Sequence, residues 1–213
     1  MTIIQCEQRS DEWFAARLGR LTASRVADAF ALPKSGKGEL AGRRNLRVQL
    51  VLERLTGRVQ ENGFVSPAME RGALLEDDAR AAYEAETGIL VEPVGFVAHD
   101  ELMAGCSPDG LTAGGYIEIK CPLATAHLEY VRGGLPNDYL LQIIHGLWIT
   151  GRAWGDFVSF HPDFPEPLRV KRTRVLASDV DLTAHELAVR LFLSEVEKEM
   201  ESVAALTAGA VAV

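Results

Sequence analysis

The spacing of apolar residues along the chain predicts helices and strands in turn. Apolar positions that recur every three to four residues predict helices over 11–18, 23–30, 45–55, 67–87, 125–131, 138–149 and 177–205. Apolar and β-branched runs between them predict strands over 89–97, 103–106, 116–121, 154–160 and 168–174. This interleaving predicts an α/β (α+β) domain with a central mixed β-sheet flanked by helices.

The length of 213 residues predicts one domain with a single substantial core. We divide it into a basic helical part (1–60), a central part (61–160), a carboxy-terminal strand and helix (161–206) and a frayed tail (207–213). No apolar run has transmembrane length, and the first six residues are too short for a secretory signal. The three cysteines lack Cys-x-x-Cys spacing, which predicts reduced thiols in a cytoplasmic protein. The five scattered histidines show no metal-ligand pairing, and we expect them on the surface or on helices.

The charge is acidic overall but unevenly distributed. The chain has 22 basic and 30 acidic side chains (22 − 30 = −8), whereas residues 1–60 carry 11 basic and 6 acidic ones (+5). A local basic wall can bind nucleic acid even on an acidic protein, because phosphate contacts dominate affinity. Lys34, Lys37, Arg43 and Arg44 are predicted loop residues that reach a DNA backbone. Arg54 and Arg58 are predicted on a solvated helix face.

One short stretch combines a turn with a polar strand face. Ser107-Pro108-Asp109-Gly110 is a favourable turn, and alternation in the strand that follows places Glu118 and Lys120 on one face. Ile117 and Ile119 then point into the core on the other face. Two carboxylates and a lysine suit Mg²⁺ or Mn²⁺ and phosphodiester cleavage. The alternative is an ordinary turn followed by a strand with one wet face.

Glu76 is a candidate third acid. Ser66 as N-cap, Pro67 at the first position and Gly88 as the stop predict its helix. The residues three, four and seven positions away are mostly small, so this face can approach a sheet closely. The alternative is that Glu76 only pairs with Arg80 on the helix surface.

Taken together, these residues resemble a known nuclease family. Gly72 to Glu76, Ser107 to Gly110, Glu118 to Pro122 and Gln142 resemble the restriction-endonuclease-like PD-(D/E)xK core, specifically the lambda exonuclease type of phage recombination nuclease. Trp13, Arg17, Gly19 and Thr22-Ala23-Ser24 extend the resemblance, which runs from about Trp13 to about Trp154.

The resemblance implies a two-metal mechanism. Glu76, Asp109, Glu118 and the Ile119 carbonyl would hold two Mg²⁺ ions, for which Mn²⁺ could substitute. One ion would activate the attacking water and the other would stabilise the leaving 3′ oxygen. Lys120 would orient the water and offset phosphate charge, and Gln142 would support the nucleophile or the metal site. The alternative for Gln142 is an ordinary polar helix residue.

The resemblance also implies a biological role. A member of this family digests linear double-stranded DNA from 5′ to 3′ and leaves a 3′ single strand for recombination by strand annealing. It implies a ring-shaped homotrimer around the duplex, a single-strand annealing partner and no membrane association. The alternatives are a structure-specific or restriction-type endonuclease on the same core and a DNA-end-binding adaptor without catalysis.

Four further residues are candidates for DNA contact. Arg17 and Ser24, with Ser107 beside them, match positions that contact the 5′-phosphate in the family, and we expect amide groups of a helix starting near Ser24 to contribute. The alternative is that Arg17 caps its own helix. Met69, near the start of the Glu76 helix, could wedge between the terminal bases, although core packing is the more common role of a helical methionine.

Overall fold

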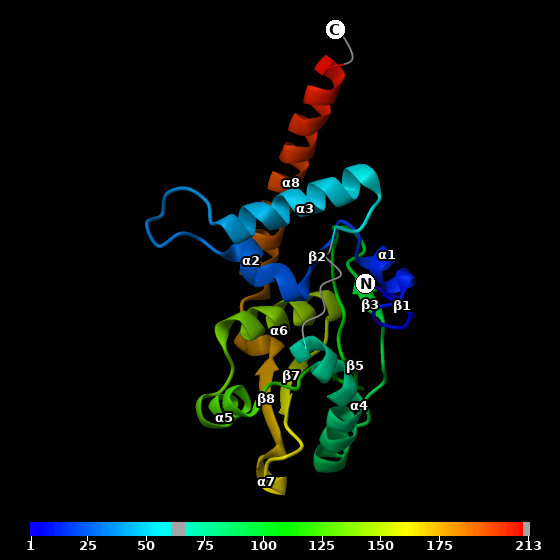
Figure 1. Cartoon of the computed structure of the whole chain (residues 1–213), viewed down its shortest axis with the longest axis vertical. Coiled ribbons are helices and arrows are strands. Elements are labelled where there is room, and N and C mark those ends of the chain that lie inside the picture. Colours follow the sequence, from blue (N-terminus) through cyan, green and yellow to red (C-terminus); the bar gives the residue numbers. More distant parts are fainter. Residues whose placement is uncertain (61–66, 211–213) are drawn as a thin grey trace.

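A computed structural model of the chain describes residues 1–60 and 67–210, without the side chains of residues 68, 69 and 207–210 (Figure 1). Its helices are α1 (Asp11–Arg17), α2 (Val26–Phe30), α3 (Ala41–Thr56), α4 (Pro67–Thr87), α5 (Ala124–Gly133), α6 (Asn137–Thr150), α7 (Glu166–Arg169) and α8 (Leu182–Ala210). Two 3₁₀ turns, η1 (Ala23–Arg25) and η2 (Ala177–Asp179), precede α2 and α8. The strands are β1 (Thr2–Ile4), β2 (Leu21–Thr22), β3 (Phe96–Ala98), β4 (Ala104–Cys106), β5 (Gly110–Leu111), β6 (Gly115–Lys120), β7 (Trp154–Phe160) and β8 (Val170–Leu176).

The strands form two four-stranded mixed sheets. One has the order β1-β3-β4-β2 and the other β5-β6-β7-β8. In each sheet one pair is parallel, β2 with β4 and β6 with β7, and the other pairs are antiparallel. The predicted mixed pairing is confirmed, but it is distributed over two sheets instead of one central sheet.

Helix α4 covers one face of the second sheet and makes a compact core with it. Its small residue Ala79 and the ring of Tyr83 pack among Ile117, Val158 and Phe160, all of them buried. The helix ends at Gly88, whose φ of 68° is left-handed and therefore favours glycine. The predicted range 67–87 is confirmed, while the proposed N-cap Ser66 lies outside the described residues.

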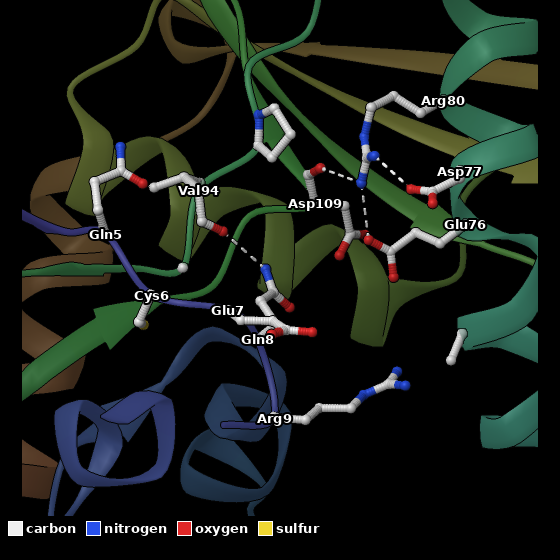
Figure 2. A pocket seen from close by; sticks show the side chains of 13 residues that line it. Gln5, Cys6, Glu7, Gln8, Arg9, Glu76, Asp77, Arg80, Val94 and Asp109 are labelled. Carbon is white, nitrogen blue, oxygen red and sulfur yellow. Dashed lines mark hydrogen bonds and ion pairs between the residues drawn. The ribbon is translucent and has the colours of Figure 1, made fainter. Parts of the chain in front are cut away.

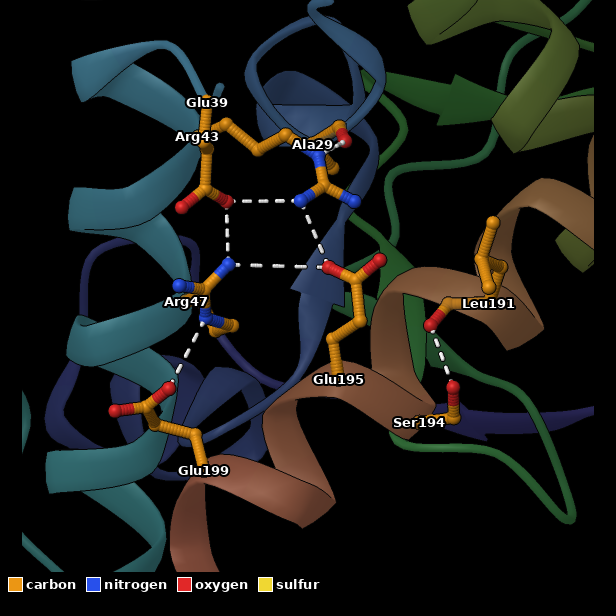
Figure 3. A network of polar contacts seen from close by, with 8 residues as sticks. All are labelled: Ala29, Glu39, Arg43, Arg47, Leu191, Ser194, Glu195 and Glu199. Carbon is orange, nitrogen blue, oxygen red and sulfur yellow. Dashed lines mark hydrogen bonds and ion pairs between the residues drawn. The ribbon is translucent and has the colours of Figure 1, made fainter. Parts of the chain in front are cut away.

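A larger core surrounds α6, which packs on the opposite side of the second sheet and also contacts η1, α2 and α8. Ion pairs connect α3 to α8 near this core (Figure 3). The Nη1 atom of Arg43 lies 2.7 Å from Glu195 and 2.8 Å from Glu39, and Arg47 contacts Glu39 and Glu199. The structure corrects the prediction that Arg43 and Arg44 are free loop residues, because both lie in α3 and the Arg43 side chain is only 12% exposed.

Three other predictions need correction. Arg54 is not on a solvated face, since its Nε donates to the Gly19 carbonyl at 2.8 Å and burial lowers its pKa. The predicted strand 89–97 reduces to Phe96–Ala98, with a single bridge between Glu92 and Leu111 before it. The predicted helix 23–30 is divided between η1 and α2.

The remaining differences concern ends and short elements. The range 154–160 is confirmed as predicted, like 67–87, and the other long helices and strands differ at their ends. The elements β1, β2, β5 and α7 were not predicted; they have two to four residues, too few for a periodic signal. α8 starts later than predicted, at Leu182, and continues past 205 to Ala210. Of the histidines, His127, His145 and His185 lie on helices, as the sequence allowed, although they are buried, whereas the buried His161 lies on neither a helix nor the surface.

Candidate metal and DNA site

Alternation along β6 separates a core face from a site face. Ile117 and Ile119 are 0% and 6% exposed and belong to the core under α4. Successive side chains of a strand point to opposite faces, so Glu118 and Lys120 face the side on which α6 lies. The hydrogen bond between Glu118 and Gln142 of α6 confirms this orientation. The predicted two-faced strand is therefore confirmed.

Glu118 is held by two donors. Its Oε1 atom accepts from Lys120 Nζ and from Gln142 Nε2, each at 2.5 Å, and the residue is only 5% exposed. Burial alone would lower the pKa of Lys120, but the carboxylates of Glu118 and Asp109 outweigh it and raise that pKa above its ordinary value. Lys120 is thus a permanent cation at the site, and it lies 5.5 Å from the ring centre of Tyr139.

The backbone of β6 holds Asp109 beside these residues. Asp109 Oδ2 accepts from the Ile119 amide at 2.5 Å, and its own amide donates to the Ile117 carbonyl at 3.1 Å. The next residue, Gly110, lets the turn pack closely against Val91, because a Cβ there would collide with that side chain. Burial, with the neighbouring Glu118 charge, raises the pKa of Asp109 well above its ordinary value.

Glu76 reaches the same region from α4. Arg80 Nη2 donates to Glu76 Oε1 at 3.0 Å and to the Asp109 carbonyl at 3.4 Å, while its Nη1 donates to Asp77 at 2.7 Å (Figure 2). Glu76 therefore pairs with Arg80 and also lies at the site, so the two alternatives considered from the sequence are both realised. Burial raises the pKa of Glu76, and the charges of Arg80 and Arg9 oppose that rise.

The candidate acids line two cavities that share several lining residues, Asp109, Lys120 and Gln142 among them, and we call them together the cleft. A cavity of about 630 Å³ is lined by Asp109, Glu118, Lys120 and Gln142, and one of about 480 Å³ by Glu76, Asp109, Ile119 and Lys120. In the described chain no three His, Cys, Asp or Glu side chains form a ready-made metal cluster. Each acid is instead held by an amide or a cation. The possible ligands are carboxylate and carbonyl oxygens, which are hard donors of the kind that a small divalent cation prefers.

A second group of residues borders the larger opening. Ser107 Oγ accepts from Trp13 Nε1 at 2.9 Å and from Arg17 Nη1 at 3.3 Å, and the Arg17 guanidinium lies 4.0 Å from the Trp13 ring centre. Ser24 is exposed and lines the same cavity. It lies in the three-residue 3₁₀ turn η1, which leads directly into α2, so a short helical stretch begins at this point as expected.

The remaining candidate, Met69, has its backbone near the start of α4, but its side chain lies outside the described residues. Several cleft residues were not singled out from the sequence, because no local motif marks them. They are Gln8, Arg9, Arg25, Gln49 and Gln60.

A buried network supports α4 from behind. The Tyr83 hydroxyl donates to Asp156 Oδ2 at 2.8 Å, and Arg174 donates to both oxygens of the same carboxylate at 2.8 Å. Asp156 is fully buried and pairs with Ile117 in the sheet register, so it lies on the opposite face from Glu118. This network fixes the helix that carries Glu76 without entering the cleft.

Comparison with known proteins adds to this geometry. Residues 12–153 match the family described as the YqaJ-like viral recombinase domain. The crystal structure of an alkaline exonuclease (LHK-Exo) from Laribacter hongkongensis is similar, with a TM-score of 0.83 and 40% identity over 94% of this chain and 99% of that chain. The structure of LHK-Exo in complex with dAMP gives a TM-score of 0.84 at 39% identity over the same shares.

A more distant structure shares the fold. A phage-related exonuclease from Haemophilus somnus 129PT has a TM-score of 0.64 at 13% identity, over 88% of this chain and 96% of that chain. Among curated proteins, none matches the sequence. No helix in the described ranges is long and apolar enough to span a bilayer.

Proposed function

Because the chain belongs to the YqaJ-like viral recombinase family, we propose that it is a Mg²⁺-dependent 5′→3′ exonuclease that digests one strand of linear double-stranded DNA. The product would be a 3′ single strand that serves homologous recombination by strand annealing. Its family makes the chain a DNA exonuclease of the recombination type, and nucleases of this type generally use a divalent metal. Direction, metal identity and mechanism are the proposed parts.

One observation carries the proposal. Glu118 is held between Lys120 and Gln142 in a cavity that Asp109 also lines, and Glu76 lines a second cavity that shares Asp109, Lys120 and Gln142 with the first. Three acids and a permanently charged lysine at one cleft are the residue types that phosphodiester hydrolysis needs, since both the attacking and the leaving oxygens carry developing negative charge.

The acids and the Ile119 carbonyl would hold two Mg²⁺ ions, with Mn²⁺ as a substitute. When bound, the ions supply a more acidic water and a Lewis acid for the leaving oxygen. Lys120 stays protonated and directs its charge at the phosphate and the attacking water. Gln142 restrains the Glu118 carboxylate through the hydrogen bond of 2.5 Å, so that one oxygen keeps a fixed position.

The Trp13, Arg17 and Ser107 group supports recognition of a 5′ end. A guanidinium with fixed donors suits a terminal phosphate, and Ser107 lies only two residues from Asp109. Arg17, Ser107 and Ser24 would together bind the 5′-phosphate of the digested strand. Met69 would separate the terminal base pair by insertion.

Assembly and location complete the proposal. The family implies a homotrimer ring around the duplex and a single-strand annealing protein as partner, and the three cysteines without Cys-x-x-Cys spacing favour a cytoplasmic enzyme.

The decisive experiment uses linear duplex labelled at one 5′ or one 3′ end, beside closed circular DNA. The purified protein should release nucleotides from the 5′ end only, should need Mg²⁺ and should leave the circle intact. Cleavage of the circle would indicate an endonuclease on the same core. Binding of ends without Mg²⁺-dependent turnover would indicate an adaptor, and release from the 3′ end would contradict the direction.

A further inference from the structure

Arg9 has an unusual backbone. It is the one non-glycine residue in the described chain with a positive φ, 73°. Side chains with a Cβ rarely adopt this left-handed conformation, because the Cβ crowds the neighbouring carbonyl. Such strain persists only where the surrounding structure enforces it, and it concentrates at functional positions.

The neighbours of Arg9 enforce this conformation. On one side, Gln8 Nε2 donates to the carbonyls of Val94 at 3.1 Å and Pro108 at 2.9 Å. On the other side, Ser10 caps α1 by accepting from the Trp13 amide at 3.3 Å. The segment is therefore tied to Pro108, the residue before Asp109, and the position of Arg9 is fixed relative to the acids.

The exposed side chain of Arg9 borders all three openings around the acids. It lines the two cavities described above and a third of about 470 Å³, which also contains Glu76, Arg80 and Asp109. Figure 2 shows its guanidinium extending toward the side of this cavity where Glu76 lies.

Arg80, also a cleft arginine, donates to Glu76, Asp77 and the Asp109 carbonyl. Within residues 1–60 and 67–210, by contrast, no hydrogen bond or ion pair joins the Arg9 guanidinium to another group. An exposed guanidinium that influences Glu76 only through its charge, and forms no hydrogen bond or ion pair among these residues, keeps its donors available for an anionic ligand.

We propose that Arg9 binds a phosphate of the DNA strand adjacent to the scissile phosphate. The inference rests on the proposed exonuclease function and extends its binding site beyond the Arg17 group. A guanidinium matches phosphate oxygens with paired donors. Arg9 lines the cavity that contains Arg17 and also the cavity that contains Arg80. Because Arg17 is assigned to the 5′-phosphate, the phosphate that Arg9 contacts lies further along the same strand, toward the duplex body and close to the acids.

The test separates the side chain from the backbone strain. Arg9→Gly removes the guanidinium and suits the left-handed φ, so its thermal midpoint should be no lower than that of the wild type. Its affinity for a duplex, measured by fluorescence anisotropy with Ca²⁺ in place of Mg²⁺, should fall about tenfold. The slope of log affinity against log salt should become shallower by about one.

Two controls accompany this variant. Arg132→Ala removes an exposed arginine of α5 that borders none of the three cavities, and it should leave both the affinity and the salt slope unchanged. Arg9→Lys keeps the charge but loses the paired donors, so it should recover the salt slope and only part of the affinity.

The contacted phosphate is located by neutralising one phosphate at a time with methylphosphonate. Methylphosphonate at one position near the scissile phosphate should weaken DNA binding by the wild type but not by Arg9→Gly. Equal affinity and equal salt slope in Arg9→Gly and the wild type would overturn the inference even when the wild type digests DNA normally. A wild type that shows no Mg²⁺-dependent digestion would instead overturn the proposed function.

Discussion

The Tyr83 hydroxyl donates a hydrogen bond of 2.8 Å to the buried carboxylate of Asp156, 73 positions away in the chain. The contact joins α4 to β7 and lies seven residues beyond Glu76 on the same helix. With burial, this acid raises the pKa of Tyr83 to about 12, so the hydroxyl stays a donor throughout the neutral pH range.

We predict that Tyr83→Phe lowers the free energy of unfolding by about 1–3 kcal/mol, because a buried carboxylate loses one donor while it keeps Arg174. Urea denaturation measures the change. The folded variant should also need more Mg²⁺ for half-maximal cleavage, since α4 holds Glu76 less firmly. A variant with unchanged stability would show that the contact contributes nothing.

Removal of one acid should separate catalysis from folding. We expect Asp109→Ala and Glu118→Ala to abolish cleavage, because each loses an oxygen ligand of a divalent cation, while DNA binding is retained. The midpoint of thermal unfolding tests metal binding independently of cleavage: Mg²⁺ should raise it in the wild type and not in either variant. Wild-type turnover in either variant would refute the assignment of these ligands.

Lys120→Ala should act on the chemical step. Its ammonium is bonded to Glu118 but is not a metal ligand, so the Mg²⁺-induced rise in the thermal midpoint should persist. The single-turnover rate should fall by about 10²-fold or more, because a charge aimed at the phosphate is lost. A full single-turnover rate in this variant would exclude a catalytic role for Lys120.

Arg17 should determine the preference for a phosphorylated end. The wild type is expected to digest a duplex with a 5′-phosphate faster than one with a 5′-hydroxyl, and Arg17→Ala should reduce this ratio. The Mg²⁺-induced thermal shift should remain, since Arg17 lies outside the acid cluster. If the ratio is undiminished in Arg17→Ala, another residue reads the phosphate.

Two buried histidines should make stability depend on pH. His145 Nδ1 and His185 Nε2 lie 3.0 Å apart, so one neutral ring donates to the other. Burial lowers the pKa of His185 to about 4, and burial with the neighbouring His185 lowers the pKa of His145 well below its ordinary value. The unfolded rings take up protons below about pH 6.5.

The sign follows from proton uptake. Between about pH 6.5 and pH 4 the unfolded chain binds more protons at these rings than the folded chain does. The contribution of this neutral pair to the free energy of unfolding is therefore fully present above about pH 6.5 and is lost as the pH falls below that value. His185→Gln should flatten the pH dependence of the urea midpoint between pH 6.5 and 5. An identical slope in the wild type and the variant would contradict this account.

The sequence determined the local elements and the chemistry they carry. Alternation in β6 separates Ile117 and Ile119 from Glu118 and Lys120, and the φ preference of Gly88 ends α4. Both signals depend on residues within a few positions of each other, so they can be read without a fold. The resemblance to a nuclease family came from the same short motifs, and the match over residues 12–153 confirmed it.

Only the tertiary structure decided which side chains meet. Gln142 reaches Glu118 from 24 residues away, and Arg43 of the predicted loop pairs with Glu195 on α8. Arg9 lies at the cleft because Gln8 ties its segment to Pro108, 100 residues further along the chain. Such contacts depend on how helices and sheets pack, and packing is set by the whole core. Residue type and spacing therefore indicate which groups can react, while the fold determines where each of them lies.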